Sequence, residues 1–141
     1  MTKRVYLDAG ILIAAWRGAG EAGLIALEML DATDTERVVS DAVWLEVFPK
    51  PLHQNRQDEV AFYRAIFDQA VHLPWSLDVL HLAQELARQH GIAAMDAIHA
   101  AFAIQHDVDE LLTAERPEKP LFRLEGIKVR SLRALVGQAR A

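Results

Sequence analysis

The apolar positions along the chain fall into short runs and into longer stretches with helical spacing. In the longer stretches apolar residues recur every three or four positions, which is the pattern of an amphipathic helix. They predict helices at residues 21–32, 42–48, 57–70, 76–90 and 94–106, with a short helix after residue 8 and another beginning at residue 131. The short runs predict strands at residues 5–7, 37–40, 71–73 and 110–113, with a fifth at residues 128–130.

Strands and helices alternate in this prediction from one end of the chain to the other. That order is typical of an α/β fold in which a mostly parallel sheet is covered by helices on both faces. We therefore expect a three-layer architecture with four or five strands. The 141 residues are enough for one sizeable core and show no repeat or linker, so we expect a single domain over residues 1–141.

Turn-forming and capping residues set the expected ends of these elements. Asp41 is expected to cap the helix at 42–48, and Pro49 and Pro51 are expected to end it, which leaves residues 50–55 as a loop. Ser76 and Gly91 are expected to begin and end the helix between them. Three acids, Asp107, Asp109 and Glu110, are expected to form a solvated charged loop.

Four acids distant in the sequence are predicted to meet at one edge of the sheet. Asp8 and Glu115 each follow a predicted strand, and Glu46 and Asp96 lie near the starts of helices. In a parallel sheet both positions lie at the carboxyl ends of the strands, where such folds bind ligands. Asp8 alone is equally well explained as the cap of the following helix.

Four neighbouring carboxylates cannot all remain as bare anions. Two of them about 4 Å apart repel by roughly 4 kcal/mol at an effective dielectric constant of 20. Some must be protonated, or pair with basic side chains, or bind divalent cations. Oxygen ligands suit Mg²⁺ or Mn²⁺, and two such ions can hydrolyse a phosphodiester without a Ser, Cys or His nucleophile.

The motifs around these acids resemble the PIN domain family, and within it the VapC-like toxins of toxin–antitoxin pairs. The resemblance spans residues 5–129 and is carried by Leu7-Asp8-Ala9 with Ile11-Leu12-Ile13-Ala14, by Ser40 with Glu46, by Met95-Asp96-Ala97-Ile98-His99, and by Leu111-Leu112-Thr113-Ala114-Glu115-Arg116. It implies an Mg²⁺- or Mn²⁺-dependent endoribonuclease with Asp8, Glu46, Asp96 and Glu115 as catalytic metal ligands. Ser40, His99 and Thr113 are candidates to hydrogen-bond those ligands.

The resemblance also implies an RNA substrate, a cognate antitoxin and homodimerisation. Three positions depart from the family pattern. Glu115 stands where the family usually has Asp, Gly10 where it often has Asn or Ser, and Phe122 comes later than the family's phenylalanine. Glu118 is a weaker alternative to Glu115. A PIN fold that binds RNA or a partner without cutting, and an RNA-processing PIN nuclease without an antitoxin, remain alternatives.

Composition and charge narrow the possible binding partners and the expected location in the cell. The net charge of −5 combines −10 over residues 1–115 with +5 over residues 116–141, so the basic end is either solvated or meets phosphates. There is no cysteine, and no apolar run reaches the roughly 18 residues of a membrane span. We expect a cytoplasmic protein without membrane contact.

Other candidate sites are weaker. Residues 18–23 match G-x-G-x-x-G, but a dinucleotide site would need a strand before them, and residues 11–16 favour a helix. His81 and Glu85 have helical spacing and are expected on a solvated face. Trp16, Trp44 and Trp75 are expected in the core or in a dimer contact rather than as platforms for bases.

Overall fold

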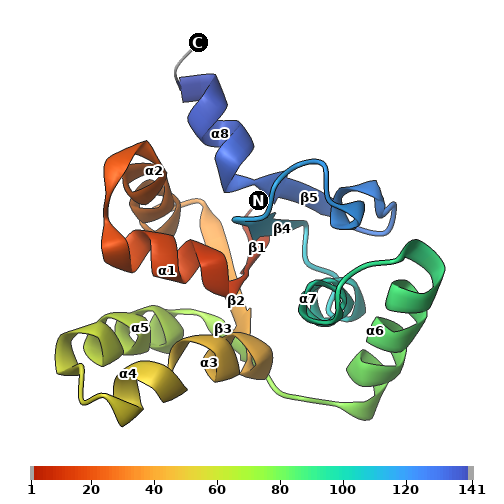
Figure 1. The fold of residues 1–141 in the computed structure, drawn as a ribbon, viewed down its shortest axis with the longest axis horizontal. Helices are drawn as coiled ribbons and strands as arrows, with labels where there is room; N and C mark the ends of the chain where they lie inside the picture. Colours follow the sequence, from red (N-terminus) through yellow and green to blue (C-terminus); the bar gives the residue numbers. More distant parts are fainter. Residues whose placement is uncertain (1, 140–141) are drawn as a thin grey trace.

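Five parallel strands form the centre of the molecule, in the order β3-β2-β1-β4-β5 (Figure 1). The computed structural model describes residues 2–139, with side chains as far as residue 136. The strands are Lys3–Leu7 (β1), Thr35–Ser40 (β2), Val71–Leu73 (β3), Glu110–Thr113 (β4) and Lys128–Ser131 (β5). The predicted parallel sheet is therefore confirmed, with its fifth strand.

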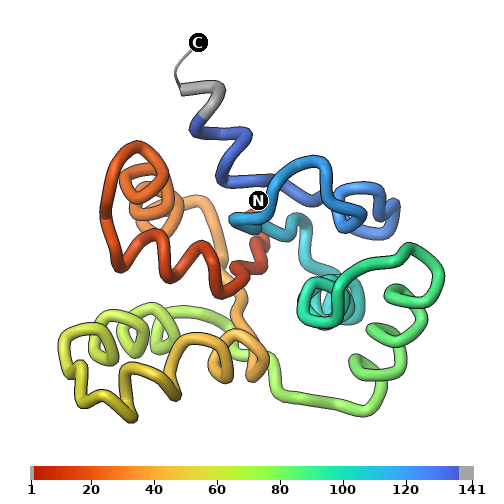
Figure 2. Tube along the Cα trace, viewed as in Figure 1, coloured from red at the N-terminus to blue at the C-terminus, as the bar shows by residue number. Residues whose placement is uncertain are grey.

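Helices cover both faces of this sheet, as predicted. One face carries α1 (Ala9–Arg17), α2 (Gly20–Leu30), α3 (Asp41–Val47), α4 (Pro49–His53) and α5 (Gln57–Gln69). The opposite face carries α6 (Leu77–His90) and α7 (Ala94–Gln105), and Figure 2 shows the chain passing across to them after β3. A 3₁₀ helix, η1 (Pro120–Arg123), precedes β5, and α8 (Leu132–Ala139) follows it.

The core lies between the central strands and the two helix layers. Tyr6 and Leu111 of β1 and β4 are fully buried, as are Ile11 of α1 and Phe102 of α7. Four alanines of α7 are buried too, so the neighbouring α6 packs close against it. This tight packing holds the carboxyl ends of β1 and β4 and the start of α7 in fixed relative positions.

Two helix boundaries differ from the sequence prediction. Residues 49–53 form α4 rather than a loop, because a proline in the first helical turn lacks only an N–H that would be unpaired anyway. The cap of α3 is Ser40 and not Asp41, since the Ser40 hydroxyl accepts hydrogen bonds from two backbone N–H groups of the first turn. Asp41 instead accepts from the Trp75 backbone and contacts His72.

Glu110 corrects the prediction of a solvated acidic loop. It belongs to β4, its side chain is only 3% exposed, and it pairs with Lys3, Lys128 and Arg130 of the flanking strands at 2.7–3.3 Å. Burial alone raises the pKa of Glu110, but hydrogen bonds from Arg130 and Lys3 outweigh it and hold the pKa at about 2. Glu110 is thus a buried charge that ties β1, β4 and β5 together.

The glycine-rich segment is a corner between two helices. Gly18 ends α1 in the left-handed conformation (φ +57°), and α2 then leaves at 114° to α1. Because a helix and not a strand precedes these glycines, the geometry of a dinucleotide fingerprint is absent here. Among the described residues no single helix is long and apolar enough to cross a membrane; only the bent pair α1 and α2 together reaches that length.

Candidate functional site

Asp8 stands at the switch point of the sheet. β1 has β2 on one side and β4 on the other, and ligands of open parallel sheets bind at such points. The Asp8 carboxylate accepts hydrogen bonds from the backbone N–H of Ile11 (3.2 Å) and from the hydroxyl of Thr113 at the end of β4. Asp8 therefore caps α1, as one of its two sequence interpretations predicts, and its carboxylate also contacts the neighbouring strand.

The surroundings of the Asp8 carboxylate favour the binding of a cation. Burial raises the pKa of Asp8 from 3.8 to about 6, while the charge of His99 and the hydrogen bond from Thr113 lower it. Among the described residues no cationic side chain hydrogen-bonds to this carboxylate or pairs with it. A buried carboxylate with only neutral donors is costly, and a bound cation would relieve that cost.

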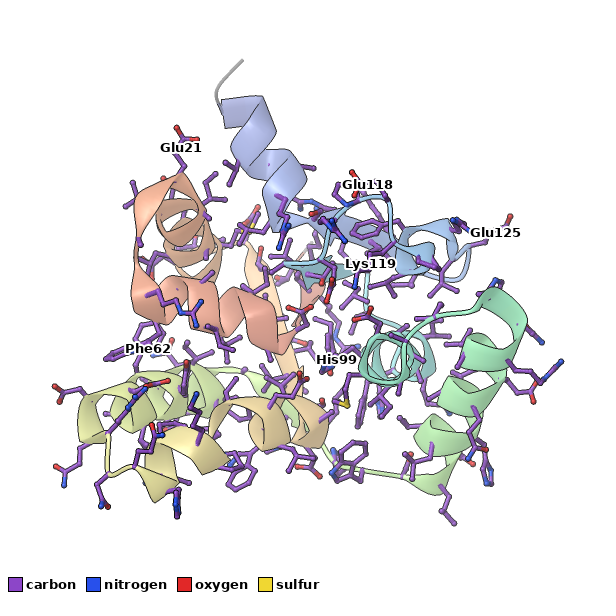
Figure 3. All side chains as sticks on the ribbon, in the orientation of Figure 1. Glu21, Phe62, His99, Glu118, Lys119 and Glu125 are labelled. Carbon is purple, nitrogen blue, oxygen red and sulfur yellow. The ribbon has the colours of Figure 1, made fainter. Side chains whose placement is uncertain are left out.

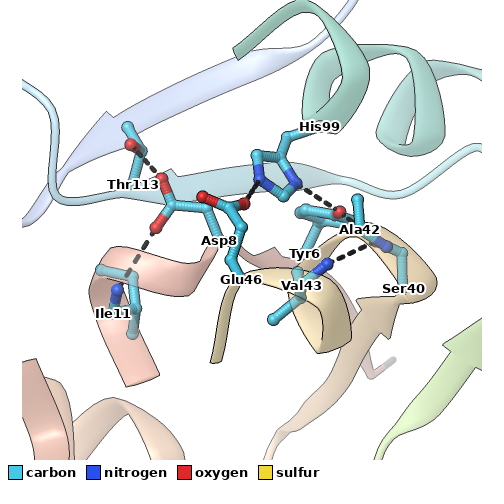
Figure 4. A network of polar contacts seen from close by, with 9 residues as sticks. All are labelled: Tyr6, Asp8, Ile11, Ser40, Ala42, Val43, Glu46, His99 and Thr113. Atoms are coloured by element: carbon cyan, nitrogen blue, oxygen red, sulfur yellow. Dashed lines mark hydrogen bonds and ion pairs between the residues drawn. The ribbon is translucent and has the colours of Figure 1, made fainter. Parts of the chain in front are cut away.

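Glu46 is held by a chain of hydrogen bonds that starts at the first turn of α3 (Figure 4). The Ser40 hydroxyl accepts from two backbone N–H groups (3.2 and 3.3 Å) and lies 2.6 Å from the Tyr6 hydroxyl. Tyr6 in turn lies 2.7 Å from Nδ1 of His99, whose Nε2 is 2.5 Å from the Glu46 carboxylate.

One assignment of protons satisfies every group in this chain. His99 donates from Nε2 to Glu46, Tyr6 donates to Nδ1, and Ser40 donates to the Tyr6 oxygen. Burial raises the pKa of Tyr6 well above its ordinary value, so its hydroxyl keeps the proton that this direction needs. The result is a Glu46 carboxylate positioned by groups of β1, β2 and α7.

Asp96 and Glu115 are the other two acids of this edge. Burial, followed by the negative charge of Glu115, raises the pKa of Asp96, while Lys119 and His99 oppose the rise. The backbone N–H of Glu115 donates to the Thr113 hydroxyl (3.1 Å), and its carboxylate pairs with Lys119 at 3.1 Å. Asp96 is thus half-buried among charges of both signs.

The four acids share one electrostatic environment without forming a finished metal cage. The charge of Glu46 raises the pKa of both Asp8 and Asp96. Yet in residues 2–139 no group of three or more His, Asp or Glu side chains is placed to hold one ion. Two of the carboxylates already have partners within the chain: Nε2 of His99 contacts that of Glu46, and Lys119 pairs with that of Glu115.

One departure from the family pattern, Gly10, has a local explanation. A Cβ on Gly10 would lie 2.7 Å from the Ala114 side chain and 3.3 Å from Asp8, so Ala114, just after β4, fills the space that a larger residue would need. The Thr113 hydroxyl donates a hydrogen bond to the second carboxylate oxygen of Asp8, so Asp8 has a hydroxyl donor although residue 10 has no side chain. Glu118 lies at the outer margin in Figure 3, away from His99, which speaks against its replacing Glu115.

Two residues at this edge were not among the sequence candidates. Tyr6 lies in an apolar strand run, but it stands two residues before Asp8, and residues two apart along an extended chain present their side chains on the same face. Lys119 lies in a loop, where no periodicity predicts its ion pair. Of the remaining candidates, His81 and Glu85 are exposed on α6, and the three tryptophans are 38–40% exposed rather than in the core.

Comparison with known proteins identifies the family. A sequence model of the PIN domain family matches residues 5–116, and the chain therefore belongs to this family. No curated protein sequence matches it. The predicted resemblance is confirmed.

The fold is similar to those of solved VapC toxins and their complexes. VapBC2 from Rickettsia felis, bound to a DNA fragment from their promoter, is 16% identical with a TM-score of 0.70, over 91% of this chain and 98% of that one. DNA-bound VapBC from Salmonella typhimurium is 18% identical with a TM-score of 0.65, over 94% and 99%. VapC20 from Mycobacterium tuberculosis, a toxin that cleaves the sarcin–ricin loop, is 13% identical with a TM-score of 0.63, over 76% and 86%.

Proposed function

We propose that this protein is a metal-dependent endoribonuclease and the toxin of a toxin–antitoxin pair, formed by a single PIN domain over residues 1–141. The observation that carries the proposal is that, in a chain of the PIN family, Asp8, Glu46, Asp96 and Glu115 are near enough for their charges to be coupled: Glu46 raises the pKa of Asp8 and Asp96, and Glu115 raises that of Asp96. The solved neighbours include VapC20, a toxin that cleaves the sarcin–ricin loop, which supports this proposal.

The residues present fit a divalent cation. The donor set consists of carboxylate oxygens, which suit Mg²⁺ or Mn²⁺, and the buried Asp8 lacks a positive partner among the described residues. We assign Asp8, Glu46, Asp96 and Glu115 as ligands. A bound ion of this kind activates water and stabilises the leaving oxygen of a phosphodiester.

The protein's own groups fix how these carboxylates are presented. Thr113 and the Ile11 amide orient Asp8, and the chain from Ser40 through Tyr6 to His99 orients Glu46. All four carboxylates could face one ion only after two contacts change. The ion pair between Lys119 and Glu115 would have to break, and one oxygen of the Glu46 carboxylate would have to be free of His99.

Cleavage of a labelled single-stranded RNA with and without metal tests the proposal. We expect cleavage in Mg²⁺ or Mn²⁺ that leaves a 5′-phosphate. Asp8→Asn and Asp96→Asn should each lose more activity than the roughly 100-fold that removing a hydrogen-bonding partner of a ligand costs. Asp68→Asn, on the exposed part of α5, is the matched control and should cleave normally. Undiminished cleavage in EDTA, or by Asp8→Asn, would contradict the proposal.

One observation favours a second candidate, a PIN fold that binds RNA or a partner without cutting it. Glu115 is both longer than the family's usual Asp and already paired with Lys119. If the wild type binds RNA but cleaves none with Mg²⁺ or Mn²⁺, this candidate replaces the nuclease. If it cleaves RNA but its expression does not slow growth, it is a processing enzyme without an antitoxin.

The remaining proposals concern its setting. We propose a cytoplasmic homodimer with RNA as substrate and a small cognate antitoxin as partner. The complexes among the solved neighbours support the antitoxin, because they are VapBC pairs and a toxin–antitoxin complex from Klebsiella pneumoniae. Rescue of growth by a neighbouring small gene would test the partner.

A further inference from the structure

A hollow of about 160 Å³ opens beside the acidic edge, among α1, α3, α4 and α5. Glu46 is part of its lining, so the hollow reaches one of the four candidate carboxylates. Three basic side chains also line it: Arg17 at the end of α1, Lys50 in α4 and Arg56 just before α5. Two further hollows also include Arg56 in their lining and lie along the start of α5.

The hollow carries a surplus of positive charge. Among the described residues Arg17 and Lys50 make no ion pair or side-chain hydrogen bond, and both are exposed. Arg56 is partly neutralised by Glu59 at 3.6 Å, and Glu59 also accepts from the Tyr63 hydroxyl at 3.1 Å. Arg17 and Lys50 are therefore available to an anionic ligand that enters beside Glu46.

The chemistry next to the acids decides which anion suits this position. Four carboxylates repel a polyanion, so the groups that anchor an RNA strand must lie beside the acidic edge and not within it. Trp16 lines the same hollow and is 38% exposed. Cations with an exposed aromatic ring are typical of sites that hold single-stranded nucleic acid through its phosphates and one stacked base.

We propose that this hollow binds the backbone of single-stranded RNA on one side of the bond to be cut, with Arg17 and Lys50 each contacting a phosphate. The inference rests on the proposed nuclease function and adds the direction from which the strand reaches the acids. It assigns a substrate-binding role to two side chains that lie outside the PIN motifs.

The test measures RNA binding separately from cleavage. Fluorescence anisotropy follows a labelled single-stranded RNA, in EDTA, with Asp96→Asn as the non-cleaving background. The double variant Arg17→Gln/Lys50→Gln should bind at least about tenfold more weakly at 0.1 M salt, and the slope of log K against log salt should fall by about 1.4, or about 0.7 per phosphate contact. Arg88→Gln/Arg123→Gln, with the same loss of charge at exposed positions on α6 and η1, is the matched control and should keep both values.

An oligo-glutamate of the same charge as the RNA separates RNA from an acidic protein segment. Tighter binding of the RNA, lost in the double variant, supports the proposal. Equal or tighter binding of oligo-glutamate would overturn it and assign the hollow to an acidic partner. RNA affinity and salt slope equal to the control's would also overturn it. If the wild type cleaves RNA while the double variant binds like the control, only this inference fails; if no RNA is bound or cut, the proposed function fails.

Discussion

At the scale of single residues, Asp8 combines burial with an incomplete set of partners. Its carboxylate has neutral donors and a pKa raised to about 6. A raised pKa means that the folded protein holds the proton to higher pH than the unfolded chain does. The stability linked to this group is therefore fully present below about pH 4 and is lost as the pH rises through about 6, by ~3 kcal/mol in total.

The first prediction follows from that sign. In EDTA, Asp8→Asn should be more stable than the wild type at pH 8, by up to about 3 kcal/mol, and the difference should vanish near pH 4. Urea unfolding at several pH values measures it, with Asp68→Asn as the exposed control. A destabilised Asp8→Asn protein at pH 8 would show that the Asp8 carboxylate has a stabilising partner that its burial hides.

The contacts of Tyr6 and Lys119 are features that could not be predicted from the sequence. The candidate acids could be predicted because the ends of parallel strands must meet at one edge. The link from Ser40 through Tyr6 to His99 depends on side chains of three elements meeting in space, which no local pattern encodes. Lys119 reaches Glu115 from an irregular loop, so the state of that carboxylate was equally hidden.

At the scale of elements, the corner between α1 and α2 depends on close backbone contact. A Cβ at Gly23 would lie 2.4 Å from the backbone of Gly18, whereas Gly20 has open space but a positive φ of +64°. The second prediction is that Gly23→Ala destabilises by about 1–3 kcal/mol or more through overpacking. Gly20→Ala should cost about 1–2 kcal/mol from its backbone conformation alone.

Thermal unfolding of the two variants distinguishes these causes. Gly20→Asn should recover part of the lost stability, because asparagine tolerates the left-handed conformation better than alanine does. No such conservative rescue exists at Gly23, where the obstacle is the neighbouring backbone. Equal stability of Gly23→Ala and the wild type would mean that the two helices can separate without penalty, against the geometry of this corner.

The Glu110 cluster joins three strands and gives the third prediction. Glu110→Gln leaves Lys3, Lys128 and Arg130 without their shared anion, and should destabilise by about 3 kcal/mol at pH 7. Because the pKa of Glu110 is lowered to about 2, its stabilisation is present above about pH 4.5 and is lost as the pH falls toward 2. The gap between wild type and variant should therefore close in acid.

Chemical unfolding at pH 7 and pH 3 tests this, with Glu36→Gln as the matched control. Glu36 pairs with Arg4 at 2.9 Å but both side chains are largely solvated, so that pair should contribute less than about 1 kcal/mol. Similar losses for the two variants would contradict a special role for the buried carboxylate.

Element boundaries show where sequence patterns suffice and where they do not. Hydrophobic periodicity predicted all five strands and the longer helices, because each buries one face against the core. It missed α4, whose prolines looked like breakers but lie in a first turn, and it misread Glu110. The three cations that neutralise Glu110 come from neighbouring strands, and their approach depends on strand order, which the sequence does not reveal.

At the scale of the whole molecule, four basic side chains near the end of the chain contact groups of the fold itself. Lys128 and Arg130 neutralise Glu110, Lys119 neutralises Glu115, and Arg133 donates from Nε to the Ala114 carbonyl at 3.0 Å. The predicted choice between a solvated tail and a phosphate-binding patch was thus incomplete; Arg140 lies outside the described residues. A carboxylate of the acidic edge already pairs with a basic side chain of its own chain, which indicates how a partner's basic side chain could inhibit the site.

The last prediction concerns that partner. If an antitoxin inserts an Arg or Lys side chain among Asp8, Glu46, Asp96 and Glu115, the inserted cation replaces the metal's positive charge and excludes the attacking water. Partner and metal then compete, so excess Mn²⁺ should weaken binding of the partner's C-terminal peptide, and Asp8→Ala should weaken it too. Asp68→Ala should leave the affinity unchanged.

Calorimetric titration of that peptide at several Mn²⁺ concentrations measures the competition, and the peptide should come from whichever small protein relieves toxicity on co-expression. A contact made only in a groove away from the acids would be insensitive to the metal, because nothing there shares a position with the ion. If neither Mn²⁺ nor Asp8→Ala changes the affinity, the partner does not act through an inserted cation, even where it still protects the cell.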